Sequence, residues 1–190
     1  MSADYLSAIV ERKRLENARR ARRERVYLEA LENGPSRDMK RGDRAIAALT
    51  RREGEALRVI SEIKFRSPSA GMIRPKLAGE AVRIAQAYAE GGAAAISVLA
   101  DRKGFGGSPL DVRRVSGAVT CPVLYKEFVL DELQVRLARL MGASMVLLLV
   151  RVLEQERLVE LIDFIRSEGM EPIVEASNLE ETERALQTDA

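Results

Sequence analysis

The sequence predicts an α/β protein in which short strands alternate with longer amphipathic helices and pair into a parallel sheet. From about residue 59, short apolar runs follow one another with centres roughly 23 to 35 residues apart, which leaves room for one helix per crossover. Glycines stand between helical and apolar runs at 91–92, 142 and 169, where helices commonly end in a left-handed residue. No two-residue hairpin signal joins consecutive apolar runs, so parallel pairing is favoured.

The individual elements follow from the period of the apolar residues. Strands are expected at 59–64, 94–99, 123–126, 145–150 and 172–175. Helices are expected at 80–90, 110–118, 131–141, 154–168 and 179–186. Residues 51–190 therefore contain five strand–helix units.

Residues 1–50 differ in kind, and we interpret them as a helical extension packed on the main domain. They are polar, Pro35 and Gly42 interrupt them, and residues 43–49 form a further short helix. Their basic residues are Arg12, Lys13, Arg14, Arg19, Arg20, Arg22, Arg23 and Arg25, against Asp4, Glu11, Glu16 and Glu24. A nucleic-acid arm is one interpretation, but no aromatic residues are interleaved, so we favour a solvated helix face.

The composition excludes several classes of function. The chain has 190 residues with one Cys, no His and a net charge of +2. Without histidine, a Ser-His-Asp hydrolase, a Cys-His protease and a histidine-built zinc site are excluded within this chain. The small net charge favours neither a nucleic-acid nor a membrane partner, and the longest apolar run, 145–150, is too short to span a bilayer. A lone cysteine, Cys121, without a secretory leader, predicts a reducing, cytoplasmic location.

Charged residues end three of the five expected strands. Because side chains alternate along a strand, Glu62 and Lys64 share one face. Lys126 and Glu175 likewise end the apolar runs at 123–126 and 172–175. The carboxyl ends of parallel strands form the ligand face of α/β folds. We therefore expect these four charges to lie together at that edge of the sheet. The alternative is that each is a solvated strand-end charge that points outward.

A cluster of lysines and glutamates at this edge suits proton transfer at a carbonyl of a small anionic molecule. An ammonium group donates to the carbonyl oxygen and attracts carboxylate or phosphate, and a glutamate accepts a proton or stabilises a developing cation. Phe105, in the glycine-rich segment 103–108, and Phe128 follow neighbouring strands. The two rings either line the pocket of an aromatic substrate or are packing residues.

Five segments carry a resemblance to a known family. They are 61–71 (SEIKFRSPSAG), 91–99 (GGAAAISVL), 105–108 (FGGS), 122–128 (PVLYKEF) and 173–175 (IVE). In order and spacing they resemble indole-3-glycerol phosphate synthase, and the resemblance extends over residues 1–190 because that family also has a helical N-terminal extension. It implies a TIM (β/α)8 barrel.

The resemblance also implies an activity and the residues that perform it. The reaction is closure of 1-(2-carboxyphenylamino)-1-deoxyribulose 5-phosphate to indole-3-glycerol phosphate with loss of CO2 and water, a step of tryptophan biosynthesis. Lys126 resembles the general acid at the ribulose carbonyl, and Glu175 the carboxylate that stabilises the developing charge. Glu62 and Lys64 resemble the pair that handles the later dehydration. Substrate contacts are implied for Ser67, Phe105, Phe128 and Leu147, and the family uses neither a metal nor an organic cofactor.

The length of the chain departs from the family pattern. A closed barrel has eight units and about 250 residues, so we expect this chain to be a portion of a longer protein or to need another polypeptide. One alternative is a non-catalytic partial barrel that self-associates, or pairs with a complementary fragment, through its open edges. Another is a different phosphate-sugar barrel enzyme such as phosphoribosylanthranilate isomerase. Glu127 also departs from the family pattern, because the family usually has Asp directly after the lysine that Lys126 resembles.

Overall fold

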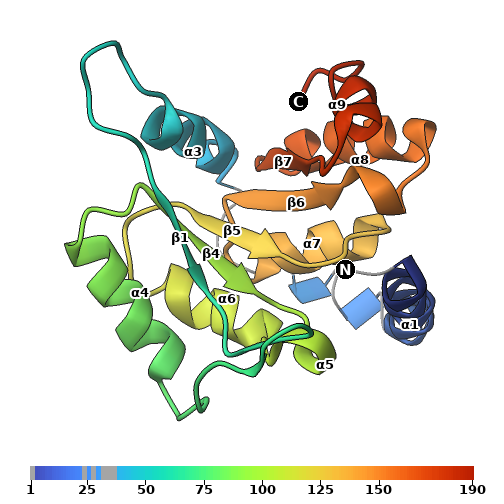
Figure 1. Ribbon diagram of the computed structural model, residues 1–190, viewed down its shortest axis with the longest axis horizontal. Helices are drawn as coiled ribbons and strands as arrows, with labels where there is room; N and C mark the ends of the chain where they lie inside the picture. Colours follow the sequence, from blue (N-terminus) through green and yellow to red (C-terminus); the bar gives the residue numbers. More distant parts are fainter. Residues whose placement is uncertain (1–2, 23–24, 27–28, 31–37) are drawn as a thin grey trace.

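The described part of the chain is built on one parallel five-stranded sheet, with helices on its outer face (Figure 1). The computed structural model describes residues 3–22, 25–26, 29–30 and 38–190. The strand order is β1-β4-β5-β6-β7, and every pairing in this sheet is parallel. The strands are β1 (Ile60–Ile63), β4 (Ala95–Leu99), β5 (Val123–Lys126), β6 (Met145–Leu149) and β7 (Glu171–Glu175). All five predicted strands are confirmed, with ends that differ by at most one residue.

A helix follows each strand of this sheet, which confirms the predicted strand–helix units. These helices are α4 (Glu80–Glu90), α6 (Pro109–Ser116), α7 (Glu132–Leu140), α8 (Gln155–Ser167) and α9 (Leu179–Ala185). Three begin at a side-chain cap, because Ser108, Asp131 and Asn178 each accept a hydrogen bond from a backbone N–H of the first turn. Such a cap satisfies one of the amide groups that a helix start leaves without a partner.

Left-handed glycines end three of the helices, as predicted. The φ angle is 85° at Gly92, 84° at Gly142 and 76° at Gly169. In the pair Gly91-Gly92 only the second residue adopts this conformation, since φ of Gly91 is −76°. The turn that each glycine allows leads the chain directly from a helix into the next strand.

Alternation along the strands divides the core into two clusters. Tyr125, Val146 and Leu148 lie in the cluster between the sheet and its outer helices. Leu124, Met145 and Leu147 lie in the inner cluster, together with Ile9 of α1 (Ala3–Ala21) and Ala45 of α3 (Arg41–Leu49). Each of the two helices from residues 1–50 therefore contributes a buried side chain to the inner cluster.

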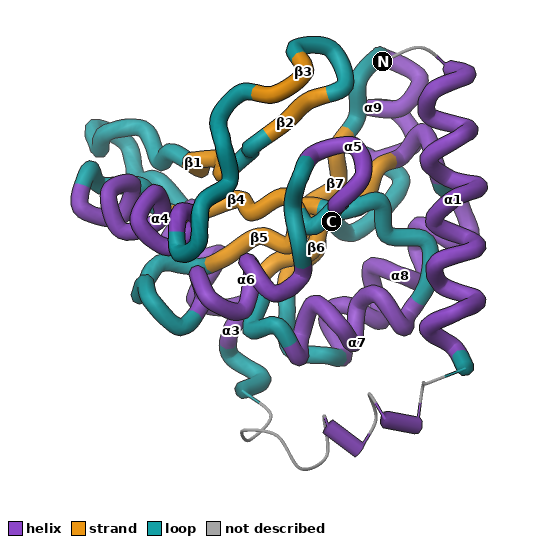
Figure 2. The backbone as a smooth tube through the Cα atoms, turned by 90° about the horizontal axis from the view of Figure 1, so that it is seen from below, coloured by secondary structure: helices purple, strands orange, loops and turns teal. Residues whose placement is uncertain are grey.

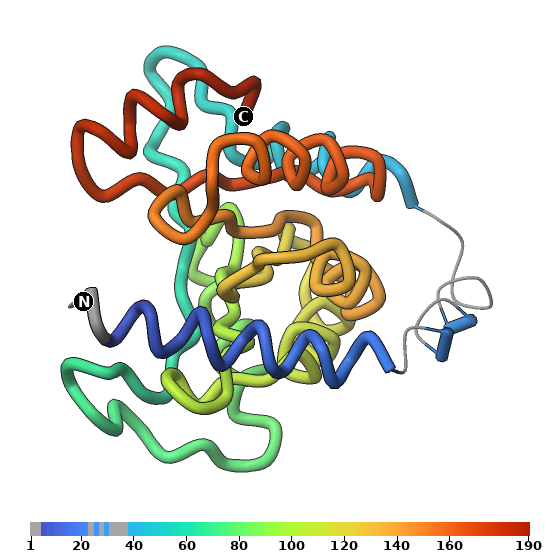
Figure 3. The backbone as a smooth tube through the Cα atoms, turned by 90° about the vertical axis from the view of Figure 1, so that its right-hand side faces the viewer, coloured from blue at the N-terminus to red at the C-terminus, as the bar shows by residue number. Residues whose placement is uncertain are grey.

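Helix α1 is less solvated than the sequence predicts. It lies along one side of the molecule in contact with α7 (Figures 2 and 3). Arg14 and Arg19 are exposed as expected, but Lys13 is only 2% exposed and Asn17 is buried, with its Nδ2 donating to Gln134 Oε1 of α7 at 2.7 Å. The prediction of a solvated face is therefore wrong for the side of α1 that carries these two residues. Arg23, Glu24 and Pro35 lie outside the described residues.

The structure adds short elements that the sequence analysis does not predict. An antiparallel pair, β2 (Arg66–Ser67) and β3 (Gly71–Met72), follows β1. A single helical turn, α5 (Arg102–Phe105), occupies part of the glycine-rich segment 103–108, for which no helix is predicted. These elements are shorter than the windows over which a hydrophobic period is detectable. No helix among the described residues is long and apolar enough to cross a membrane.

We expect Gly107→Ala to destabilise the fold beside α5. Gly107 N donates to Asp101 O at 2.9 Å, and a Cβ added at this glycine would overlap the backbone carbonyl of Leu99. Relieving such an overlap requires a backbone shift, which costs about 1–3 kcal/mol of unfolding free energy. Urea denaturation measures this loss. The control is Gly117→Ala, where the added Cβ lies an ordinary 3.5 Å from Arg113 O; equal losses in both variants contradict the prediction.

Candidate active site

Seven of the eight predicted site residues line one cavity of about 200 Å³ at the carboxyl ends of the strands. They are Glu62, Lys64, Phe105, Lys126, Phe128, Leu147 and Glu175. Ser67 does not line this cavity. It lies in β2, where its Oγ accepts a hydrogen bond from Ala70 N at 3.0 Å. The structure thus gathers residues from all five strands of the sheet, or from the segments that follow them, around one cavity.

Glu175 joins two cations of the cavity. Its Oε2 lies 2.8 Å from Lys126 Nζ, and its Oε1 lies 3.0 Å from Arg151 Nη2. The lysine side chain is 26% exposed and the glutamate side chain 35%, so neither charge projects freely into solvent. These pairs orient the three side chains, and their partial exposure keeps their contribution to stability small.

The second ion pair lies on β1 and directly after it. Lys64 Nζ donates to Glu62 Oε1 at 2.7 Å, which confirms that the two residues share one face. Strand register places Ser97 of β4 opposite Glu62, and the Ser97 hydroxyl donates to Glu62 Oε2 at 3.5 Å. Both charged side chains are about one-third exposed, at 31% and 35%. They can therefore contact a molecule in the cavity while they remain paired.

Aromatic and aliphatic side chains form the apolar part of the cavity. The rings of Phe105 and Phe128 are tilted by 39° with centroids 6.1 Å apart, a favourable separation for an aromatic pair. Leu99, Leu147 and Leu149 supply the aliphatic lining and are buried. The cavity thus combines an apolar surface with acid and base groups at its rim.

A buried cluster of charges lies between this cavity and α1. Lys13 Nζ is 2.7 Å from Asp101 Oδ1 and 3.0 Å from Glu127 Oε1, and all three side chains are at most 2% exposed. Arg12 Nη2 also contacts Asp101 Oδ1, at 2.6 Å. Burial by itself lowers the pKa of Lys13, but the charges of Glu127 and Asp101 outweigh it and hold this pKa above its ordinary value of 10.5. Lys13 is therefore an ammonium ion at neutral pH.

The cluster continues into the backbone that carries both phenylalanines. Asp101 caps α5, since its Oδ2 accepts a hydrogen bond from Gly104 N at 2.6 Å. Glu127 Oε1 accepts one from Phe128 N at 2.9 Å. Glu127 thus joins α1 to the Phe128 backbone through one carboxylate oxygen.

Sequence reasoning missed Arg151, Asp101 and Lys13. A local signal was present for Asp101 and Arg151. Each follows a predicted strand, at 94–99 and 145–150, just as the predicted site charges lie at the ends of their strands. No local signal marks Lys13, which lies in an arginine-rich helix and meets partners roughly 90 and 115 residues further along the chain. Only the tertiary fold brings it to the strand ends.

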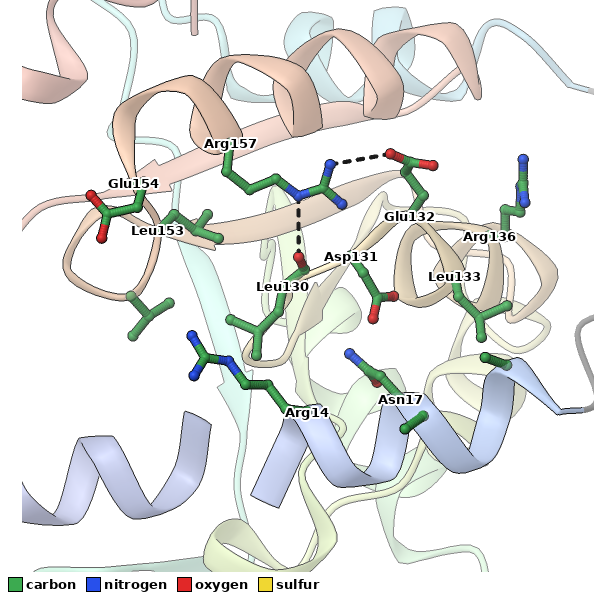
Figure 4. Close-up of a pocket in the computed structure, with 13 residues that line it drawn as sticks. Arg14, Asn17, Leu130, Asp131, Glu132, Leu133, Arg136, Leu153, Glu154 and Arg157 are labelled. Carbon is green, nitrogen blue, oxygen red and sulfur yellow. Dashed lines mark hydrogen bonds and ion pairs between the residues drawn. The ribbon is translucent and has the colours of Figure 1, made fainter. Parts of the chain in front are cut away.

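A larger cavity of about 530 Å³ lies beside α1, between α7 and the start of α8 (Figure 4). Its charges compensate one another: Arg157 Nη1 lies 3.2 Å from Glu132 Oε1, and Arg157 Nε donates to Leu130 O at 3.3 Å. None of the predicted site residues lines it. Among the described residues, no group of three or more Asp, Glu or Cys side chains is placed to hold a metal ion.

Comparisons with known proteins agree on one family. A family model described as indole-3-glycerol phosphate synthase matches residues 6–190. Proteins named indole-3-glycerol phosphate synthase from Kineococcus radiotolerans and Leptospira interrogans are 47% and 45% identical over 138 and 132 residues, or 73% and 70% of this chain. These matches span about half of each relative, 50% and 52%. A protein of the same name from Chlorobium phaeovibrioides is 38% identical over 188 residues, which cover 98% of this chain and 70% of that protein.

The Lys13 cluster predicts a pH dependence of stability. A raised pKa in the folded state means that the ammonium stabilises the fold fully below pH 10.5, its ordinary value, and that this stabilisation is lost as pH rises through the higher folded value. We therefore expect the difference in unfolding free energy between the unmodified chain and Lys13→Met to be large at pH 8 and to narrow above pH 10.5. Urea denaturation across this range measures it. A difference that stays constant contradicts the assignment.

Proposed function

Because this chain belongs to the indole-3-glycerol phosphate synthase family, we propose that its strand-end cavity is the reaction site of that synthase. The proposed reaction closes 1-(2-carboxyphenylamino)-1-deoxyribulose 5-phosphate to indole-3-glycerol phosphate, with release of CO2 and water, in cytoplasmic tryptophan biosynthesis. The observation that carries the proposal is the convergence of Lys126, Glu175, Glu62 and Lys64 on one cavity that also contains two aromatic rings.

Lys126 and Glu175 are assigned to the ring closure. As the carboxyl-bearing ring carbon attacks the ribulose carbonyl carbon, the ammonium group of Lys126 gives a proton to the carbonyl oxygen. Attack leaves positive charge on the aniline portion, which the carboxylate of Glu175 stabilises. Their separation of 2.8 Å supports a common point of action. Loss of CO2 then restores the aromatic ring.

Glu62 and Lys64 are assigned to the dehydration that follows. The hydroxyl group formed from the carbonyl must leave as water, which requires one group that gives a proton and one that takes a proton. The pair meets this requirement within 2.7 Å. Phe105 and Phe128 flank the anthranilate ring, Leu147 contacts its apolar part, and Ser67 remains a predicted substrate contact from outside the described cavity.

The proposal is tested with the purified chain and the carboxyphenylamino substrate. Formation of an indole product is followed by fluorescence, and binding of a substrate analogue with its ketone reduced to an alcohol is followed by calorimetry. Indole formation supports the activity. Binding without indole formation supports the substrate assignment and contradicts catalysis by this chain alone. A chain that neither binds the analogue nor forms indole contradicts the proposal.

We expect Lys126→Ala to lower turnover by at least ~10²-fold, the low end for a positioned general acid. Turnover is measured in a protein that contains the whole barrel, with indole fluorescence as the readout. The matched control is Lys40→Ala, an exposed lysine that precedes α3 and lies away from the cavity lining. A near-normal rate for Lys126→Ala removes this residue from the acid role.

A second candidate is a partial barrel that self-associates through its edges. Strands β1 and β7 each have a strand neighbour on one side only in the described sheet. Val59 and Ile60 at the β1 edge, and Leu179 and Leu186 around α9, are exposed apolar residues. Exposed strand edges with apolar side chains favour association between chains.

This candidate predicts a concentration-dependent dimer in analytical ultracentrifugation. Val59→Lys places a charge at the β1 edge and should lower the fraction of dimer. A chain that sediments as a monomer at all concentrations contradicts the candidate, and turnover by that monomer favours the synthase alone.

A further inference from the structure

One buried ammonium group connects α1 to both loops that carry the cavity's aromatic rings. Lys13 Nζ contacts Asp101, directly after β4 and Ala100, and Glu127, directly after β5. Its third partner is Glu16 Oε2 on the same helix, at 3.0 Å. The two strand-end carboxylates come from neighbouring strands, so their charges repel each other unless a cation separates them.

The Asp101 contact leads to Phe105. Asp101 holds Lys13 with Oδ1 and the amide of Gly104 with Oδ2. That amide belongs to α5, a single helical turn that ends at Phe105. This cap holds the start of α5, together with the backbone hydrogen bond from Gly107 N to Asp101 O at 2.9 Å. We therefore expect a displacement of the Asp101 carboxylate to shift the turn that carries the Phe105 ring.

The Glu127 contact leads to Phe128. Glu127 Oε1 accepts both the Lys13 ammonium and the amide of Phe128, so one oxygen atom joins α1 to the phenylalanine backbone. Its other oxygen, Oε2, is buried without a hydrogen-bond partner among the described residues. Lys13 is thus the one cation that contacts this carboxylate in the described structure.

Removal of the ammonium leaves two buried carboxylates without their common partner. An unpaired buried charge is strongly unfavourable, so a carboxylate must take up a proton or move toward water. Arg12 still contacts Asp101, but among the described residues no second cation contacts Glu127. Either response disturbs the contacts through which Asp101 and Glu127 hold α5 and the Phe128 amide.

We propose that Lys13 is a positioning residue that sets the separation of Phe105 and Phe128, and through it the binding of the substrate's aromatic ring. The role in substrate binding rests on the proposed function, whereas the role in holding the rings does not. The N-terminal helix acts on the cavity through this side chain, which does not itself line the cavity.

The first test measures the rings without any ligand. The chain has four phenylalanines, so incorporation of 4-fluorophenylalanine gives four fluorine resonances, assigned by single Phe→Tyr variants. In Lys13→Met we expect the resonances of Phe105 and Phe128 to shift or broaden while that of Phe164, on α8, stays in place. Lys13→Arg keeps the positive charge, so the resonances of Phe105 and Phe128 should lie close to their positions in the unmodified chain.

Two further variants separate this role from general loss of structure. Glu127→Gln removes the negative charge that pairs with Lys13, so it should shift the Phe128 resonance more than that of Phe105. This test remains available if Lys13→Met fails to fold. Arg14→Met alters the next residue of α1, which is exposed, and should leave both resonances unchanged. Unchanged Phe105 and Phe128 signals in Lys13→Met, or in Glu127→Gln if that variant alone folds, overturn the proposal. A shift of Phe164 as large as the others overturns it too.

The second test measures binding of the ketone-reduced substrate analogue by calorimetry. We expect Lys13→Met to weaken binding by about tenfold or more, since small misplacements of positioning groups have large effects, and Lys13→Arg to recover part of it. Failure of the unmodified chain to bind overturns the proposed function and the substrate part of this inference, while the fluorine spectra still decide the ring positions. Equal binding by the unmodified chain and Lys13→Met, with shifted fluorine signals, overturns the link between ring position and substrate affinity.

Discussion

Parallel strands in register end at one edge of their sheet, and the candidate site depends on this constraint. Each strand of the sheet ends in, or is soon followed by, a charged residue: Lys64, Asp101, Lys126, Arg151 and Glu175. Each strand pairs in parallel with the next in the order β1-β4-β5-β6-β7. This pairing fixes their carboxyl ends side by side. Because side chains alternate, the same strands send aliphatic residues to the inner cluster. Acid, base and apolar groups therefore meet without any long-range sequence motif.

The sequence predicts the strand–helix units because their periods are local properties. Capping residues such as Asp131 and left-handed glycines such as Gly142 mark the boundaries by local chemistry. The four selected charges could also be predicted, since alternation within β1, β5 and β7 depends only on neighbouring residues. Short elements such as α5 have no period to detect.

Lys13 could not be predicted for a different reason. Nothing within α1 distinguishes it from the arginines around it, and a basic residue on a helix is usually solvated. Its burial depends on two carboxylates that arrive from β4 and β5. The burial of Asp101 and Glu127 is equally hard to predict from their own segments. A buried carboxylate requires a cationic partner, and here that partner comes from a remote segment. A pair of this kind is visible only once both segments are placed.

The charge balance of the cavity explains why the helix and the strand ends belong together. Lys64, Lys126 and Arg151 oppose Glu62 and Glu175, so these five groups carry a net +1. Glu127 also borders the cavity and would cancel that charge if it faced a ligand uncompensated. Its carboxylate is instead turned to Lys13. By pairing with Glu127 on the side away from the cavity, Lys13 of α1 offsets part of this negative charge, which favours the anionic substrate proposed for the cavity.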